Sequence, residues 1–93
     1  MTERAVHVVL SGCVQGVGFR WWTVQEASTL KLRGWVRNRR DDTLEAVFAG
    51  DAQDVGLMLE KCRAGPIMAR VDEIRISDSD LPDTQDFTHR PTV

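Results

Sequence analysis

A glycine-rich stretch at residues 12–20 reads Gly-Cys-Val-Gln-Gly-Val-Gly-Phe-Arg and separates an apolar run, Ala5–Leu10, from a run with helical spacing. Its glycines allow the backbone to turn tightly and to point successive N–H groups in one direction. Such a concavity binds anions, and the N-terminus of a following helix adds to the attraction. Arg20 falls in the first helical turn, where its guanidinium group can bind the same anion through two hydrogen bonds. The stretch therefore predicts a strand, a phosphate-binding loop and a helix.

Two simpler interpretations of this stretch stay open at the level of the residues. Glycine is the usual residue of tight strand-to-helix turns, so the loop can be purely structural. An arginine at the start of a helix is commonly a solvated surface residue. The spacing also differs from that of a Walker A loop, which ends in Gly-Lys followed by Ser or Thr.

The regions around this stretch alternate between strand-like and helix-like spacing. We predict strands at residues 4–11, 32–38, 44–48 and 69–76, and helices at 19–30 and 51–64. With right-handed crossovers, this βαββαβ order gives a ferredoxin-like α+β sandwich, an antiparallel four-stranded sheet with two helices on one face. Residues 87–93 can add a short strand, which Pro91 confines to an edge of the sheet.

Length and composition predict one domain that spans residues 1–93. The net charge of −2 argues against a nucleic-acid partner, because proteins of that class normally carry a basic excess. Cys13 and Cys62 lack metal-ligand spacing and are expected to be free thiols, as is usual in the cytosol. No stretch resembles a signal peptide or a membrane span. We therefore expect a cytoplasmic protein with no membrane partner, and a monomer at this size.

Asn38 is a second candidate functional residue, at the end of the predicted strand 32–38. The helix at 19–30 returns the chain, so strands 4–11 and 32–38 run parallel and Asn38 lies on the same edge of the sheet as the loop. An asparagine amide both donates and accepts hydrogen bonds, so it can hold a water molecule in a fixed orientation. An asparagine beside a hairpin also often bonds only to the local backbone, and both roles stay open.

The two motifs, residues 12–20 and Gly34-Trp35-Val36-Arg37-Asn38, closely resemble those of the acylphosphatases. The resemblance covers essentially the whole chain, in order and at the length of the family. Further positions that fit the family are Glu45-Ala46, Gly50, Gly65-Pro66, Ala69 and Val71.

This resemblance implies a small hydrolase that splits the carboxyl–phosphate anhydride bond of acyl phosphates into a carboxylate and inorganic phosphate. It implies no metal and no cofactor. Arg20 then binds the phosphate, and Asn38 orients the attacking water. The backbone of the substrate-binding loop forms a cradle for the phosphate at Gln15, Gly16, Val17, Gly18 and Phe19.

Three positions depart from the pattern of the family. Leu30-Lys31-Leu32 lacks a glycine that many members have here, so Lys31 is expected in the left-handed conformation, at a cost of about 1 kcal/mol. Asp41-Asp42 stands where an Asp-Gly turn is common, and aspartate tolerates the same conformation better than most residues. Arg39 stands where some relatives have a small hydroxyl residue. These departures affect stability and tuning more than the assignment of the site.

Two other functions are weighed against the enzyme. An RNA-binding domain has the same element order, and Arg33, Trp35 and Arg37 share one sheet face, but strand 4–11 offers no second large aromatic. We expect Arg33 and Arg37 to pair with Glu45 or another acidic residue instead. A non-catalytic module that binds phosphate or carbamoyl phosphate occurs within carbamoyl-transferring maturation proteins. Those chains are far longer and carry zinc-finger cysteines, which favours a free-standing enzyme here.

Overall fold

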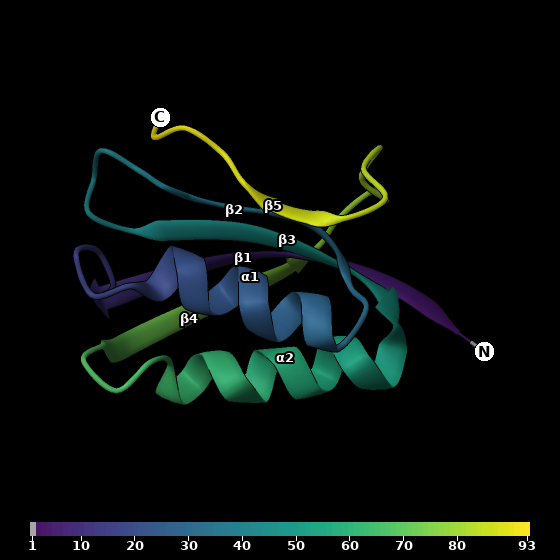
Figure 1. Cartoon of the computed structure of the whole chain (residues 1–93), viewed down its shortest axis with the longest axis horizontal. Helices are drawn as coiled ribbons and strands as arrows, with labels where there is room; N and C mark the ends of the chain where they lie inside the picture. Colours follow the sequence, from purple (N-terminus) through teal and green to yellow (C-terminus); the bar gives the residue numbers. More distant parts are fainter. Residues whose placement is uncertain (1) are drawn as a thin grey trace.

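The computed structural model describes residues 2–93 as a five-stranded sheet with two helices packed on one face (Figure 1). The elements are β1 (Glu3–Cys13), α1 (Phe19–Thr29), β2 (Arg33–Asn38), β3 (Leu44–Asp51), α2 (Ala52–Ala64), β4 (Arg70–Asp78) and β5 (Phe87–His89). The strands lie in the order β4-β1-β3-β2-β5. The predicted ferredoxin-like α+β fold is confirmed. None of the helices within residues 2–93 is long and apolar enough to span a bilayer.

The sheet differs from the predicted four antiparallel strands by the addition of β5, which pairs parallel with β2 and makes the sheet mixed. The Phe87 side chain anchors this strand because it is buried and stacks on Phe48, with ring centroids 5.3 Å apart. Pro91 has no backbone N–H, and the strand ends before it at His89. The edge strand expected within residues 87–93 is therefore present but shorter.

The hydrophobic core lies between the sheet and the helices. The fully buried side chains of the core come from β1, β2, β3 and both helices, and include Val6, Val8, Leu10, Phe19, Ala27, Val36, Phe48, Val55 and Met58. Cys62 is part of this core, where burial raises the pKa of its thiol to about 12. Cys62 and the exposed Cys13 are both free thiols, as predicted.

Three local irregularities confirm expectations from the sequence. Ser11 of β1 lies opposite Glu73 and Gly12 opposite Val71, so Asp72 bulges out of β4 where its alternation slips. Lys31 and Asp42 adopt left-handed conformations, with φ of 59° and 70°. The chain therefore turns sharply at Lys31 and Asp42 without a glycine at either position.

Gly34 allows the closest approach between β2 and β3. Its φ is 136°, and a Cβ atom there would lie 1.9 Å from the carbonyl oxygen of Val47. We expect Gly34→Ala to lower the free energy of unfolding by about 3 kcal/mol, because backbone atoms must move to admit the methyl group. Urea unfolding measures the change. Gly56→Ala, in an open position of α2, is the control and is expected to stabilise by about 0.5–1 kcal/mol. Equal stability of the two variants would contradict the close approach.

The sheet face away from the helices carries a network of charged side chains around Glu45. The Glu45 carboxylate accepts hydrogen bonds from His7 Nε2 at 2.6 Å and from Arg37 Nε at 2.7 Å. Arg33 pairs with Glu3. The expected pairing of Arg33 and Arg37 with acidic neighbours is confirmed, so two of the cations that an RNA-binding face needs are already engaged.

This network makes stability depend on pH. Burial raises the pKa of Glu45, but the hydrogen bonds from His7 and Arg37 together hold that pKa below its ordinary value. The stabilisation is therefore present at neutral pH and is lost as the pH falls through the lowered pKa. We expect Glu45→Gln to reduce the free energy of unfolding by about 1.5–3 kcal/mol at neutral pH and by much less at about pH 3. Urea unfolding at both pH values checks this; an equal deficit at both would contradict it.

Candidate active site

The loop between β1 and α1 is shaped by two glycines. Gly16 and Gly18 have φ of 72° and 78°, in the left-handed region that glycine enters without strain. A Cβ atom at either position would meet nothing within 4 Å, so the loop stands open to solvent on this side. Gly18 is also the N-cap of α1, and its carbonyl oxygen accepts a hydrogen bond from the N–H of Trp22 at 3.0 Å. The predicted strand, glycine-rich turn and helix are therefore present.

The backbone of this loop has N–H groups left to donate. Within residues 2–93, no hydrogen-bond acceptor is found for the N–H groups of Gly16–Trp21. The first turn of α1 contains no acidic residue that would neutralise the positive end of the helix dipole. Free N–H groups and an uncompensated helix N-terminus together favour an anion here.

The side chain of Gln15 fastens this loop to the turn between β2 and β3. Its Nε2 donates to the carbonyl oxygens of Arg39 and Thr43, at 2.7 and 2.9 Å. Those two residues flank the turn that follows β2. Because β1 and β2 both pair antiparallel with β3, they run parallel to each other, and their ends lie at the same edge of the molecule (Figure 1). Gln15 therefore couples the loop to the segment that carries Asn38, a role the sequence did not indicate.

Asn38 is the last residue of β2, and the structure leaves its side chain free to bind a ligand. Its Oδ1 atom is buried and has no hydrogen-bond partner within residues 2–93. A buried acceptor without a partner is unfavourable by about 1–3 kcal/mol, and such atoms in native proteins call for an explanation. The backbone of Asn38 is held separately, since its carbonyl oxygen accepts from the N–H of Val93 at 3.3 Å. The local backbone bond considered for Oδ1 is not formed.

A cavity of about 290 Å³ lies where the loop, the start of α1 and the end of β2 meet. Its lining consists of Val14, Gly16, Gly18, Phe19, Arg20, Trp21, Val24, Asn38 and His89. The structure thus brings together five of the seven predicted site residues. The other two lie beside the cavity: Gln15 bonds to the β2–β3 turn, and Val17 packs against the core.

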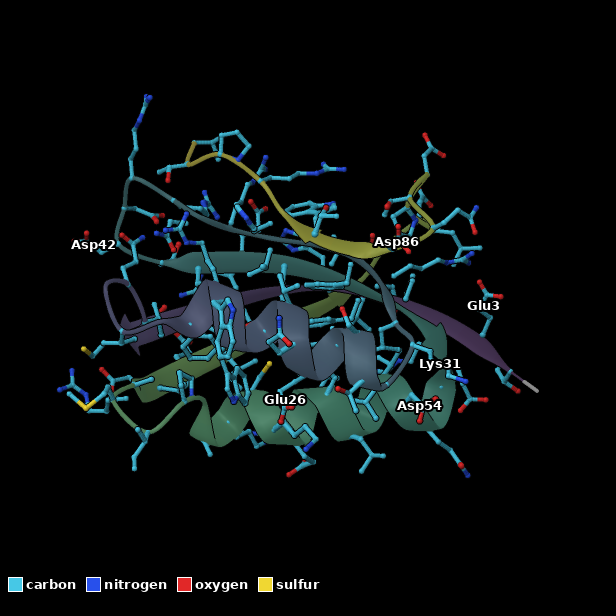
Figure 2. All side chains as sticks on the ribbon, in the orientation of Figure 1. Glu3, Glu26, Lys31, Asp42, Asp54 and Asp86 are labelled. Atoms are coloured by element: carbon cyan, nitrogen blue, oxygen red, sulfur yellow. The ribbon has the colours of Figure 1, made fainter. Side chains whose placement is uncertain are left out.

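Arg20 reaches this cavity from the first turn of α1. The side chain is exposed and forms no ion pair with any of the residues 2–93. Of the side chains labelled in Figure 2, Asp42 lies at the loop end of the molecule, whereas Glu3, Lys31, Asp54 and Asp86 lie toward the other end. The Arg20 guanidinium group is therefore available to bind an anion held by the loop.

Sequence reasoning missed four side chains of the lining, Val14, Trp21, Val24 and His89. The position of His89 depends on β5 pairing with β2, and three residues are too few to reveal a period of two. One signal in the sequence could have placed His89. It lies two residues after Phe87, and alternate residues of an extended strand face the same side of the sheet. In the pairing register, His89 lies opposite Val36.

Comparison with known proteins agrees with the resemblance of the motifs. The acylphosphatase family profile matches residues 6–89. The acylphosphatase of Rhodospirillum rubrum is 49% identical over 90 residues, which cover 97% of this chain and 99% of that protein. The structure of an acylphosphatase from Coxiella burnetii superposes with a TM-score of 0.90 at 34% identity, covering 95% of this chain and 93% of that one.

A larger protein also contains this fold. Full-length HypF, solved in a phosphate- and nucleotide-bound form, superposes with a TM-score of 0.89 at 25% identity, over 98% of this chain and 12% of that chain. The match with the Rhodospirillum protein extends over nearly the full length of both chains. The residues matched by the family profile include the loop, Arg20 and Asn38. These are also residues that line the cavity. The chain therefore belongs to the acylphosphatase family.

Proposed function

We propose that this protein hydrolyses the carboxyl–phosphate anhydride bond of acyl phosphates and releases a carboxylate and inorganic phosphate. The observation that carries the proposal is the cavity that Arg20, the loop and Asn38 line together, with the Oδ1 atom of Asn38 buried and without a partner among residues 2–93. A phosphate-binding site needs the arginine and the loop. The missing hydrogen-bond partner of the Asn38 Oδ1 is explained when a reacting water is bound beside the phosphate.

The chemistry of an acyl phosphate matches these groups. Its leaving group is a carboxylate of low basicity, which departs without a strong general acid. What remains is to neutralise charge on the equatorial phosphoryl oxygens and to place a water in line with the leaving oxygen. Hydrogen-bond donors and one guanidinium group supply the first requirement, and one amide supplies the second.

Arg20 and the backbone of Gln15–Phe19 are the phosphate-binding groups in this mechanism. The planar guanidinium group can donate two parallel hydrogen bonds to phosphate oxygens, and the loop N–H groups donate to the others. Because these donors are held in place before the substrate arrives, little reorganisation is needed as charge develops. The side chain of Gln15 acts as a positioning group, since it ties the loop to the β2–β3 turn.

Asn38 orients the nucleophile. Its Oδ1 accepts a hydrogen bond from a water molecule, which directs a lone pair of the water oxygen toward phosphorus. The new bond forms between this oxygen and phosphorus as the bond from phosphorus to the acyl oxygen breaks. The proton of the water passes to a phosphate oxygen of the substrate, so no side-chain base is needed.

Steady-state hydrolysis of benzoyl phosphate in the presence of EDTA tests the function and its independence of metal ions. We expect turnover that inorganic phosphate inhibits competitively. A folded protein that binds phosphate but does not hydrolyse benzoyl phosphate would instead support the alternative, a non-catalytic phosphate-binding module like a domain of a larger protein.

We further propose that the protein works as a monomer in the cytoplasm. The free thiols of Cys13 and Cys62 support a reducing compartment, and the whole cavity is lined by residues of one chain. Sedimentation velocity and cell fractionation test the two statements; a dimer, or recovery in an oxidising compartment, would contradict them.

A further inference from the structure

We infer that Trp21, Val24 and His89 form a subsite for the acyl group, which makes the enzyme selective for acyl phosphates with planar, apolar acyl groups. The inference rests on the proposed function, because the bound phosphate fixes where the acyl group lies. It goes further in naming the class of substrate and the side chains that select it.

The cavity has a polar part and an apolar part. Arg20, the loop glycines and Asn38 supply the donors and acceptors suited to a phosphate and a water. The side chains of Trp21 and Val24 bring large apolar surfaces to the same cavity, and such surfaces do not suit a phosphate. The portion of the substrate that matches them is its acyl group.

The apolar part is built by two elements that face each other. Trp21 and Val24 are three residues apart on α1 and so lie on the same side of this helix. His89 comes from β5, which contacts α1. It shares the strand face of Phe87, whose ring is buried in the core beneath the helices. A ring wall from the sheet and an indole from the helix therefore border one cavity.

Trp21 is unusual among the aromatic side chains of this protein because it is 69% exposed. Its neighbour Trp22 is partly buried, packs edge-on against Phe19 with centroids 5.3 Å apart, and lies against the core. The indole of Trp21 does little for the fold, yet it borders the candidate active site. Stacking of a planar acyl group on an aromatic ring is favourable by about 0.5–1.5 kcal/mol beyond the burial of its area.

The size of the cavity fits this assignment. At about 290 Å³ it lies near the small end of ligand pockets, which range over about 300–1,000 Å³. It therefore suits a small acyl phosphate rather than a phosphorylated protein segment. The exposed imidazole of His89 also has N–H donor capacity within the cavity, which suits the carbonyl oxygen of an acyl group.

The test compares kcat/KM for benzoyl phosphate and acetyl phosphate in the natural protein and in Trp21→Ala, Trp21→Phe and His89→Ala. The ratio of the two kcat/KM values is followed from variant to variant, because the different intrinsic reactivities of the substrates then cancel. We expect Trp21→Ala to lower this ratio about 10-fold, which corresponds to about 1.4 kcal/mol. Trp21→Phe keeps a ring and is expected to keep most of the ratio, and His89→Ala is expected to lower it about threefold.

Two controls separate this subsite from general damage. Leu57→Ala removes another exposed apolar side chain, on α2 outside the cavity, and is expected to leave the ratio unchanged. Inhibition of Trp21→Ala by inorganic phosphate is expected to match that of the natural protein, since phosphate does not reach the subsite. Hydrolysis of both substrates with an unchanged ratio in Trp21→Ala would overturn the subsite alone. Hydrolysis of neither substrate by the natural protein would overturn the proposed function, and the subsite with it.

Discussion

Asn38→Ala is expected to lower kcat for benzoyl phosphate by about 10²–10³-fold, the loss seen when one preorganised polar group is removed from an active site. Inhibition by inorganic phosphate is expected to change little, because Arg20 and the loop remain. An effect on kcat with little effect on phosphate binding is what a residue acting on the attacking water must show. Steady-state kinetics of the variant, with phosphate as competitive inhibitor, gives both quantities.

The stability of the same variant provides an independent check. Since Oδ1 of Asn38 is buried without a partner among residues 2–93, its removal breaks no hydrogen bond to this atom and relieves an unfavourable burial. We expect Asn38→Ala to be as stable as the natural protein or slightly more stable in urea. A variant that loses activity because it unfolds would show the reverse.

A matched control for Asn38→Ala is Gln25→Ala, which removes an exposed amide from α1 outside the cavity. This variant is expected to keep kcat within about twofold, as most surface substitutions do. If Asn38→Ala retained kcat within about threefold, water orientation by Asn38 would be wrong. The buried Oδ1 would then need a purely structural explanation.

Much of the fold followed from local patterns in the sequence. The change from a period of two to a helical period after residue 18 located β1 and α1, and the slip in alternation near Asp72 located the bulge in β4. The left-handed turns at Lys31 and Asp42 were expected from the residues that replace the usual glycines. These features are local, because neighbouring residues alone determine them.

An edge strand within residues 87–93 was expected, but its exact bounds and its partner strand were not, because they depend on contacts between distant segments. β5 contains three residues, and what holds it is the stacking of Phe87 on Phe48 and its pairing with β2. Without that strand, His89 could not be placed in the cavity. The hydrogen bonds of the Gln15 side chain to the β2–β3 turn likewise join residues at least 24 positions apart. Sequence reasoning therefore located the residues proposed to bind the phosphate but missed those proposed to face the acyl group.

Arg20→Gln is expected to have the largest effect of any single substitution, a fall in kcat/KM of about 10³-fold or more. An arginine that stabilises a transferring phosphoryl group typically contributes about 10³–10⁵ in rate. Phosphate inhibition is expected to weaken strongly as well, because the same guanidinium group binds the product. Arg20→Gln thus differs from Asn38→Ala, which leaves phosphate binding intact.

Arg20→Lys separates charge from geometry. A lysine keeps the positive charge but cannot donate two parallel hydrogen bonds from a planar group. We expect this variant to recover phosphate inhibition in part while kcat/KM stays about 10²-fold below that of the natural protein. Equal activity of Arg20→Lys and the natural protein would show that charge alone suffices and would contradict a bidentate contact.

Arg40→Gln is the matched control for charge, because Arg40 is exposed and its side chain forms no ion pair within residues 2–93. It lies in the turn after β2, at the same end of the molecule as the loop, but outside the cavity lining. If only long-range attraction of the phosphate mattered, both arginines would contribute similarly and salt would abolish both effects. We expect Arg40→Gln to change kcat/KM less than about threefold at moderate salt, while the loss in Arg20→Gln persists there. That difference would assign the effect of Arg20 to direct contact with the phosphoryl group, since a screened surface charge cannot produce it.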